Sequence, residues 1–441
     1  MTVAVTRTKA EQAYSEIFEA VAAKLPGGRA VAEARKAAIG AFAGLGFPHR
    51  RIEEWKYTDL RSALKEALPP AIADATPVTA AEINAALEGL ASIDAHRVVF
   101  VNGGHRPELS SAGAEKGLEI GPLAFALARD AGDALGRWDA PGQEAVVALN
   151  TAFVTDGALI RIGKGTRLAK PLLLVFVRAG KAPRLVATRN SLKIGDGAQA
   201  TIIEAHLALP DAGGGQASTL SEIAVGDGAS VSHVKCTLEG AGTSHVASWL
   251  AALGARARYR AFHLTAATGL VRNTLQVTYK GEGAKLDISG CFLGRGSEHI
   301  DTTLVVDHAV PGCESRELFK GVLADRSRGI FQGKVIVRPD AQKTDGKQMA
   351  QVLMLSEDAE FDSKPELEIY ADDVVCGHGS TAAELDSDAL FYLRSRGIPL
   401  EEARRMLIES FVGEALDKVE DERLREALSA MSLGRLAGLV A

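Results

Sequence analysis

A cysteine and a histidine stand two residues apart in the segment Cys376-Gly377-His378-Gly379, and no other histidine of the chain lies two residues from a cysteine. Apolar and polar residues alternate in the stretch before the pair, which predicts a β-strand leading into it. Side chains two residues apart in a strand share a face, so the thiol and the imidazole would project together. Thiolate and imidazole are donors that soft metals and iron–sulfur intermediates favour. The spacing is therefore typical of half a metal site.

A purely structural role is the alternative for both residues. Cysteine is among the most frequently buried residue types and packs as a small hydrophobe, and His378 stands between two glycines, where a turn residue is expected. Half a ligand set does not by itself define a site. The residues alone leave this choice open.

Composition and charge describe an ordinary globular protein. The 441 residues are 46% hydrophobic and 24% charged, and this length predicts two or three domains unless a repeat fold absorbs the middle. A net charge of −6, with lysine and arginine scattered along the chain, argues against nucleic-acid binding. The start lacks the apolar core of a secretory signal, and no stretch approaches the ~18 apolar residues that span a bilayer. We therefore expect a cytoplasmic protein that does not bind membranes.

The cysteine pattern excludes several common sites. Four cysteines are widely spaced without a CxxC motif, which excludes a zinc ribbon, a thioredoxin motif and a self-contained four-cysteine cluster motif. Free thiols fit a reducing compartment. The four are Cys236, Cys291, Cys313 and Cys376.

The middle of the chain carries a repeat of glycine turns. Gly-x-Gly turns at residues 163, 195 and 226 follow an interval of about 31 residues, and a fourth such turn stands 55 residues further on, at residue 281. Short alternating segments rich in Val, Ile, Leu and Thr follow these turns. Strands that repeat at a fixed period, with glycine at tight corners, predict a solenoid of stacked rungs, here a parallel β-helix. A β-sandwich is the less favoured alternative, because its turns recur every ~8–12 residues.

Helices are expected on both sides of this core. Helical spacing of apolar residues predicts two helices over residues 9–46, interrupted at Pro26-Gly27-Gly28, a short helix near residues 80–90 and a first strand at residues 98–101. At the other end, Gly397 stops one helix and Pro399 starts the next, whose apolar stripe comprises Leu400, Ala403, Leu407, Phe411 and Ala415, with Ile408 and Val412 beside it. We divide the chain into an N-terminal helical region (1–95), a β-helix core (96–383) and a C-terminal helical domain (384–441). The last helices could simply cap the open end of the solenoid, and capping is compatible with docking a partner.

Several kinds of enzyme chemistry are missing. The nearest approach to a phosphate-binding P-loop, residues 329–335, has the wrong spacing and no hydroxyl after Lys334, so the chain should not bind ATP itself. No nucleophile elbow, HExxH helix or dinucleotide fingerprint is apparent. Many β-helix proteins cleave polysaccharides with grouped acids, and a cytosolic carbohydrate-active enzyme is the alternative function. Its candidate acids are Asp340, Asp345, Asp358 and Asp362, which are more simply interpreted as solvated turn residues.

Residues 51–60, Arg-Ile-Glu-Glu-Trp-Lys-Tyr-Thr-Asp-Leu, resemble the N-terminal signature of the SufB/SufD family. The segments Phe331-Gln332-Gly333-Lys334, Cys376-Gly377-His378-Gly379 and residues 391–398 resemble the shared core of that family. The likeness covers most of the chain and is strongest from about residue 315 to 415. The signature at residues 53–57, together with the absence of the additional cysteines of a SufB, favours the SufD branch.

The resemblance implies a right-handed parallel β-helix with flanking helical regions. It also implies a non-catalytic scaffold subunit of a SufB–SufC–SufD complex for ATP-dependent iron–sulfur cluster assembly. SufC would hydrolyse the ATP and engage the C-terminal helices, about residues 386–441. SufB would pair along the β-helix, and the nascent cluster would form at that interface with a SufB cysteine and a SufD histidine. The matching histidine is His378, with Cys376 beside it as a second candidate ligand.

The same resemblance sets the expectation for cofactors. The isolated chain should hold none stably, while iron or an iron–sulfur cluster would be shared transiently with SufB. A flavin is associated with the complex, but no residue of this chain identifies its contacts. A homodimer formed without SufB is a further alternative for the assembly.

Overall fold

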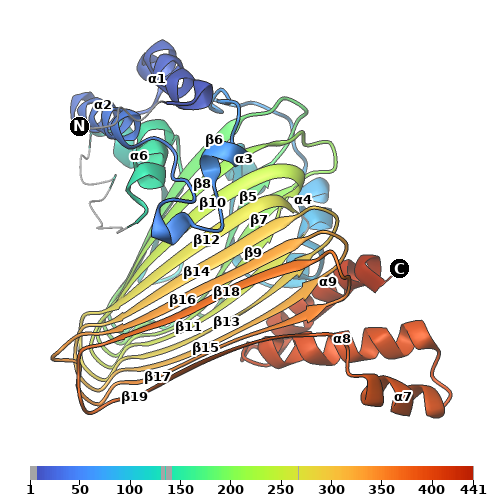
Figure 1. Ribbon diagram of the computed structural model, residues 1–441. Coiled ribbons are helices and arrows are strands. Elements are labelled where there is room, and N and C mark those ends of the chain that lie inside the picture. The colour runs from blue at the N-terminus through green and yellow to red at the C-terminus, as the bar shows by residue number, and fades with distance from the viewer. Residues whose placement is uncertain (1–6, 131–134, 136–141, 267, 441) are drawn as a thin grey trace, which may run out of the picture.

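A computed structural model describes residues 7–130, 135, 142–266 and 268–440. Two long sheets of mainly parallel strands face each other, and the chain passes from one to the other with almost every strand (Figure 1). Helices lie on either side of this β-solenoid. The predicted β-helix core with flanking helical regions is confirmed.

The two sheets take alternate strands of the chain. Sheet A has nine strands: β3 Leu118–Pro122, β4 Ala158–Ile162, β6 Leu185–Ile194, β8 Gly215–Val225, β10 Gly240–Leu253, β12 Thr268–Tyr279, β14 His299–His308, β16 Arg328–Val337 and β18 Glu360–Ile369. Sheet B has ten: β1 His96–Val101, β2 Gly104–His105, β5 Leu172–Arg178, β7 Gln199–Ala208, β9 Ser230–Leu238, β11 Arg258–Ala266, β13 Lys285–Gly294, β15 Glu314–Leu323, β17 Asp345–Met354 and β19 Val375–Ala383. Among the strand pairs of the described residues, only β1–β2 and β3–β4 are antiparallel.

One corner of the solenoid repeats in every rung, as the glycine turns predict. The second glycine of each predicted turn has a positive φ, for example +65° at Gly197 and Gly228, a conformation that glycine adopts without steric cost. The rung that the spacing skips is also present: Arg256 takes this position with φ +55°, and its N–H donates to Glu282 O at 2.8 Å. The interval of 55 residues is therefore two rungs, one of them without its glycine.

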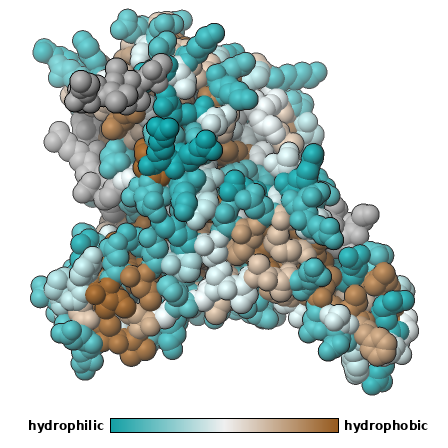
Figure 2. Space-filling model, viewed as in Figure 1, coloured by the Kyte–Doolittle hydropathy of each residue, from teal (hydrophilic) through white to brown (hydrophobic). Residues whose placement is uncertain are grey.

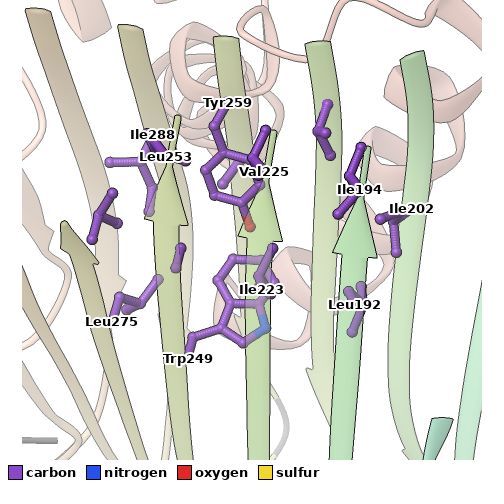
Figure 3. Packing of buried hydrophobic residues seen from close by; sticks show 14 of the residues in the cluster. Leu192, Ile194, Ile202, Ile223, Val225, Trp249, Leu253, Tyr259, Leu275 and Ile288 are labelled. Atoms are coloured by element: carbon purple, nitrogen blue, oxygen red, sulfur yellow. The ribbon is translucent and has the colours of Figure 1, made fainter. Parts of the chain in front are cut away.

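The interior between the sheets is largely apolar. Inward-facing Leu, Ile, Val and aromatic residues from successive strands stack along the solenoid, with Trp249 and Tyr259 among Ile223, Val225 and Leu275 (Figure 3). Each rung buries its inner face mainly against its neighbours and the opposite sheet, which is how a repeat fold acquires one continuous core.

Most of the N-terminal helices cover the early strands of sheet A, whereas residues 80–92 pack on the outer face of sheet B. The N-terminal helices comprise α1 Lys9–Val21, α2 Arg29–Leu45, α3 Leu60–Ala63, α4 Ala80–Leu87, α5 Leu123–Ala128, α6 Glu144–Phe153 and the 3-10 turns Ala22–Lys24, Glu53–Trp55, Glu88–Ser92 and Pro107–Leu109. Thr8 and Glu11 form a capping box at the start of α1, and Gly46 ends α2 with φ +73°. Tyr14, Phe42 and Phe153 pack together in a core that also contains Leu185 of β6. The predicted interruption near residue 27 is confirmed.

The C-terminal helices are α7 Ser387–Ser395, α8 Leu400–Leu416 and α9 Glu422–Val440. Helices α8 and α9 pack on the outer face of sheet B, where Ile408 and Val412 meet outward-facing strand residues. The interpretation that they cap the open end is therefore wrong for α8 and α9. The predicted apolar face of α8 is largely confirmed, since Ala403, Ile408, Val412 and Ala415 are buried, whereas Leu400 is 38% exposed. Helical periodicity shows which face of a helix is apolar. It does not show which surface of the protein that face packs against.

Helices and strands share the central part of the chain, since α5 and α6 lie between β3 and β4. β1 begins at His96 and β19 ends at Ala383. The three-part division at 95/96 and 383/384 stays a prediction. Within the described residues, no helix is both long and apolar enough to cross a membrane.

Candidate functional site at the open end of the solenoid

The solenoid ends in two edge strands, β18 and β19. Each pairs on one side only, β18 with β16 and β19 with β17, and each stands last in its sheet among the strands that the structure describes. β19 carries both Cys376 and His378, as the alternation predicts. An edge strand presents unpaired backbone N–H and C=O groups, so it is a template for another chain.

The register shows which way the two side chains point. Cys376 pairs with Gly346 and His378 with Gln348 of β17. A Cβ built on Gly346 would lie 3.5 Å from Val335 of sheet A and 3.8 Å from the Cys376 sulfur, so this position faces the space between the sheets. Cys376 accordingly packs beside a small apolar cluster that contains Val335 and Val337. The alternation of strand side chains places His378 on the same inward face at the open end.

Exposure separates this pair from the other cysteines and histidines. Cys236, Cys291 and Cys313 are buried, whereas Cys376 is half-buried. His378 is the one exposed histidine of the chain, because β19 is an edge strand and no further described strand covers it. The most accessible thiol and the most accessible imidazole therefore lie two residues apart on one face of an edge strand.

The thiol of Cys376 is protonated in the isolated chain. Partial burial raises its pKa above the usual value, and a backbone contact with Gly346 offsets this only in part. The thiolate is the species that binds metals, so metal binding here must release a proton. A cation supplied from outside would lower the pKa of Cys376 and favour the thiolate.

Unsatisfied polar groups lie in the rungs beneath the pair. Gln348, the register partner of His378, follows Glu317 of β15 in the same inward ladder. Glu317 is 3% exposed, neither carboxylate oxygen has a hydrogen-bond partner, and burial raises its pKa to about 8. Nothing in the sequence marks Glu317 as unusual, because its partner-free setting is created by the stacking of the rungs.

A groove lies at the same end of sheet B, and Cys376 and His378 are among the residues that line it. The groove has a volume of about 390 Å³. Gly377, which has no side chain, is one of its lining residues. The rest of the lining is charged, polar and apolar: Asp287, Arg316, Glu317, Leu318, Lys347, Gln348, Met349, Val375 and Lys418. Val375 is 61% exposed at its rim. The terminal rung thus offers a partner one groove that contains the thiol and the imidazole.

The acids of the alternative carbohydrate enzyme do not form a catalytic group. Asp345 is paired with Arg316 at 2.6 Å and Asp362 with Arg328 at 2.5 Å, while Asp340 is exposed in a turn. Asp358 is likewise an exposed turn residue. The solvated-turn interpretation therefore holds for Asp340 and Asp358 but is wrong for Asp345 and Asp362, which are partly buried strand residues paired with arginines.

The aromatic segment at residues 51–60 is a docking element that sequence patterns did not reveal as such. Trp55 is buried, with the Arg272 guanidinium 4.0 Å from its ring centroid, and Arg272 donates to Glu54 O at 2.6 Å. Glu53 reaches the terminal rung, where Lys364 of β18 lies 2.5 Å from its carboxylate. This segment therefore connects the N-terminal helices to the far strands of sheet A.

The fold and the site together define a class: a β-solenoid with helical flanks that exposes a thiol and an imidazole on an open end. Comparison with known proteins makes this specific. Residues 176–411 match the family described as SUF system FeS cluster assembly, SufBD core domain, and residues 8–174 match the SufBD protein N-terminal region. The chain belongs to the SufBD family of iron–sulfur cluster assembly proteins.

Individual relatives lead to the same family. The chain is 33% identical to the iron-sulfur cluster assembly protein SufD of Escherichia coli over 89% of its own length and 90% of that protein. It is 32% identical to the iron-sulfur cluster assembly SufBD family protein slr0076 of Synechocystis over 90% of each chain. The SufD of Bacillus subtilis is 29% identical over 64% of this chain. The resemblance found in the sequence is confirmed, and the chain is of the SufD type.

Proposed function

We propose that this chain is the scaffold subunit of a SufBCD-type complex and that Cys376 and His378 offer ligands to iron or a nascent iron–sulfur cluster. The observation that carries the proposal is their position: the exposed imidazole and the accessible thiol share one face of the edge strand β19. Two ligands from one chain leave the remaining coordination positions to a partner. The names of the similar proteins, which describe iron–sulfur cluster assembly, support this assignment.

The partner at this end is a SufB-type β-solenoid. Two edge strands of parallel sheets can be continued or covered by the end of a second solenoid, which would satisfy their backbone groups. Apolar side chains already lie exposed at the rung: Ile369 is 43% exposed, Tyr370 59% and Val375 61%. Such a contact would enclose the Cys376–His378 pair between the two chains. Native mass measurement with subunit identification distinguishes it from a homodimer of this chain.

The ATPase SufC engages the C-terminal helices. α7 buries none of its residues, and Phe391 and Tyr392 on it are 74% and 57% exposed. Hydrophobic residues show at the surface of this region in Figure 2, where Figure 1 places α7. Isolated helices of this length are marginal in water, so a packed partner is expected to stabilise α7.

The SufC surface on the C-terminal helices and the SufB surface on β18 and β19 together suggest how ATP binding is coupled to cluster assembly. ATP binding by two SufC subunits would move α7 and α8, and the motion would reach the SufB–SufD contact through sheet B, on which α8 packs. This chain is not itself an enzyme, and ATP is hydrolysed in SufC. Its metal is transient cargo that is shared with SufB in the cytoplasm, and any flavin belongs to the assembled complex.

Replacing His378 by alanine tests the ligand role. The side chain is exposed, so His378→Ala should leave the thermal midpoint and the formation of the complex unchanged, while cluster formation on the complex falls at least 10-fold. The measurement is iron and sulfide content, with the visible absorption of the cluster, after assembly by the purified complex. Cys376→Ser should act in the same direction.

Ser380→Ala is the matched control, because Ser380 lies two residues further along the same face of β19. It should retain full assembly. Unchanged cluster formation in His378→Ala would remove the ligand role from the proposal, and an equal loss in Ser380→Ala would assign the effect to the strand instead of the imidazole.

Replacing exposed aromatic residues of α7 by aspartate tests whether SufC binds to this helix. The double substitution Phe391→Asp and Tyr392→Asp should weaken SufC binding at least 100-fold, since buried aromatic residues dominate such interfaces. Calorimetric titration of SufC into the purified chain measures it. Phe125→Asp on α5, where the side chain is 68% exposed, is the control and should bind normally. Wild-type affinity in the double variant would place SufC elsewhere.

A further inference from the structure

A second group of metal-binding side chains lies inside the solenoid, far from β19. It comprises His206 of β7, Glu239 in the turn after β9, and His245 of β10. One ligand atom from each of the three lies within 4.8 Å of the others, and all three residues are buried. Five strands of sheet B separate β7 from β19, which at the usual strand spacing is about 29 Å. The group is therefore independent of Cys376 and His378.

We propose that His206, Glu239 and His245 form a binding site for one divalent transition-metal ion. Two imidazoles and one carboxylate are the donor set of catalytic zinc and non-haem Fe(II) sites. This proposal does not depend on the function assigned to the end of the solenoid, because it uses none of the same residues.

Contacts with neighbouring side chains orient the two histidines of the cluster. His245 Nδ1 lies 2.7 Å from a Glu239 carboxylate oxygen, which fixes the ring, and its other nitrogen, Nε2, is buried without a hydrogen-bond partner. A buried imidazole nitrogen without a partner is costly unless something binds it. His206 stacks on Phe176, with ring centroids 4.7 Å apart, and its Nε2 lies 3.4 Å from Glu204. A carboxylate behind a histidine is the usual second support of a metal ligand.

There is also room at the cluster. A small internal cavity of about 10 Å³ is lined by His206, Glu239 and Arg178. This volume is close to that of one water-sized probe, enough for an ion or a single bound water but not for an organic ligand. The cavity is thus matched to a metal ion rather than to a substrate.

The protonation states suit a cation. Burial lowers the pKa of His245 to about 4, which favours its neutral imidazole, and the hydrogen bond with His245 and the charge of Arg178 bring the pKa of Glu239 down to about 2 despite burial. Neutral imidazole and ionised carboxylate are the forms that bind metals. Among the groups facing the cluster, Glu204 adds negative charge and Lys235 positive charge, and burial lowers the pKa of Lys235 to about 8.

Arg178 supports the competing explanation. Its guanidinium lies 3.8 Å from Glu239 Oε1 and donates to Glu239 O at 2.9 Å and to Gly213 O at 3.0 Å. Arg178, Glu239 and His245 could on this view form a closed ionic network that needs no metal. The network leaves His245 Nε2 without a hydrogen-bond partner, which a bound metal ion would supply. The two explanations differ in one measurable property, the binding of a metal.

Cobalt(II) is the probe, because its visible bands and X-ray absorption report its ligands. The full-length chain, produced in medium containing Co²⁺ so that the ion can enter during folding, should carry one equivalent after gel filtration. His245→Gln and His206→Gln should each lower the retained Co²⁺ at least 10-fold. His308→Gln is the matched control, since His308 is buried with an unpartnered Nδ1 but lies outside the cluster. The double variant Cys376→Ala with His378→Ala should retain the wild-type equivalent.

X-ray absorption of the wild-type chain keeps the test decisive if a histidine variant fails to fold. Nitrogen and oxygen neighbours without sulfur support the internal site. A sulfur neighbour, or loss of Co²⁺ only in the Cys376/His378 double variant, would assign the ion to the end of the solenoid and overturn the proposal. A wild-type chain that carries less than a tenth of an equivalent would overturn it as well and leave the ionic network as the explanation.

Discussion

Replacing Arg272 by leucine should destabilise the protein by about 3–5 kcal/mol, the cost expected when one partner of a buried ion pair is removed. Arg272 and Asp301 are both fully buried, and their charged atoms are 2.5 Å apart. Arg272→Leu leaves the Asp301 carboxylate with only the hydroxyls of Thr58 and Thr303 as partners. Urea unfolding followed by circular dichroism measures the change in the free energy of unfolding.

The same substitution should release the N-terminal segment. Arg272 holds Glu54 O and stacks on Trp55, so Arg272→Leu removes the hydrogen bond and the cation–π contact that dock this segment on sheet A. Limited proteolysis should therefore cut near residues 50–60 faster in the variant than in the wild-type chain. This result would show that Arg272 holds the segment that resembles the family signature on sheet A.

Two variants control the interpretation. Arg338→Leu breaks a surface pair with Asp307, in which Arg338 is half exposed, and should cost about 0–1 kcal/mol. The double variant Arg272→Leu with Asp301→Leu should recover much of the lost stability, because no unpaired charge remains buried. A loss below about 1 kcal/mol in the single variant would show that the Arg272–Asp301 pair is not a principal support of this contact.

Glu317→Gln should make the protein more stable at neutral and alkaline pH. The pKa of Glu317 is raised to about 8 by burial, whereas the unfolded carboxyl titrates near ~4.3. Between these values the folded chain holds a proton that the unfolded chain has lost. Stability therefore falls as pH rises, by roughly 1.4 kcal/mol per pH unit, and is highest below the unfolded pKa.

Glutamine keeps the shape of the side chain without an ionisable group. The difference in unfolding free energy between Glu317→Gln and wild type should therefore grow by about 3 kcal/mol from pH 5 to pH 7 in favour of the variant. Chemical denaturation at several pH values measures it. Glu314→Gln is the control on the same strand, where Glu314 is partly exposed and paired with Lys285, and should show no such trend. A pH-independent difference for Glu317→Gln would mean that the carboxyl has a partner and an ordinary pKa.

Local patterns predicted much of the architecture. Glycine turns and alternating strands indicated the solenoid because the rungs repeat the same backbone conformation. Helix caps and apolar periodicity placed the helices near residues 9–45 and 387–440. The skipped rung at Arg256 was missed, since a residue other than glycine took a positive φ there. The surface that α8 covers was also mistaken, because helical periodicity shows which face is apolar but not which sheet receives it.

The sequence by itself determined the solenoid, its helical flanks and the shared face of Cys376 and His378, because strand alternation and turn chemistry are local properties. Only the tertiary structure decided that β19 ends its sheet, and hence that His378 is exposed while the other histidines are covered. Only stacking joined Arg272 to Asp301 and gathered His206, Glu239 and His245. Burial and the contacts between rungs depend on residues far apart in the chain. Local sequence patterns do not specify such contacts.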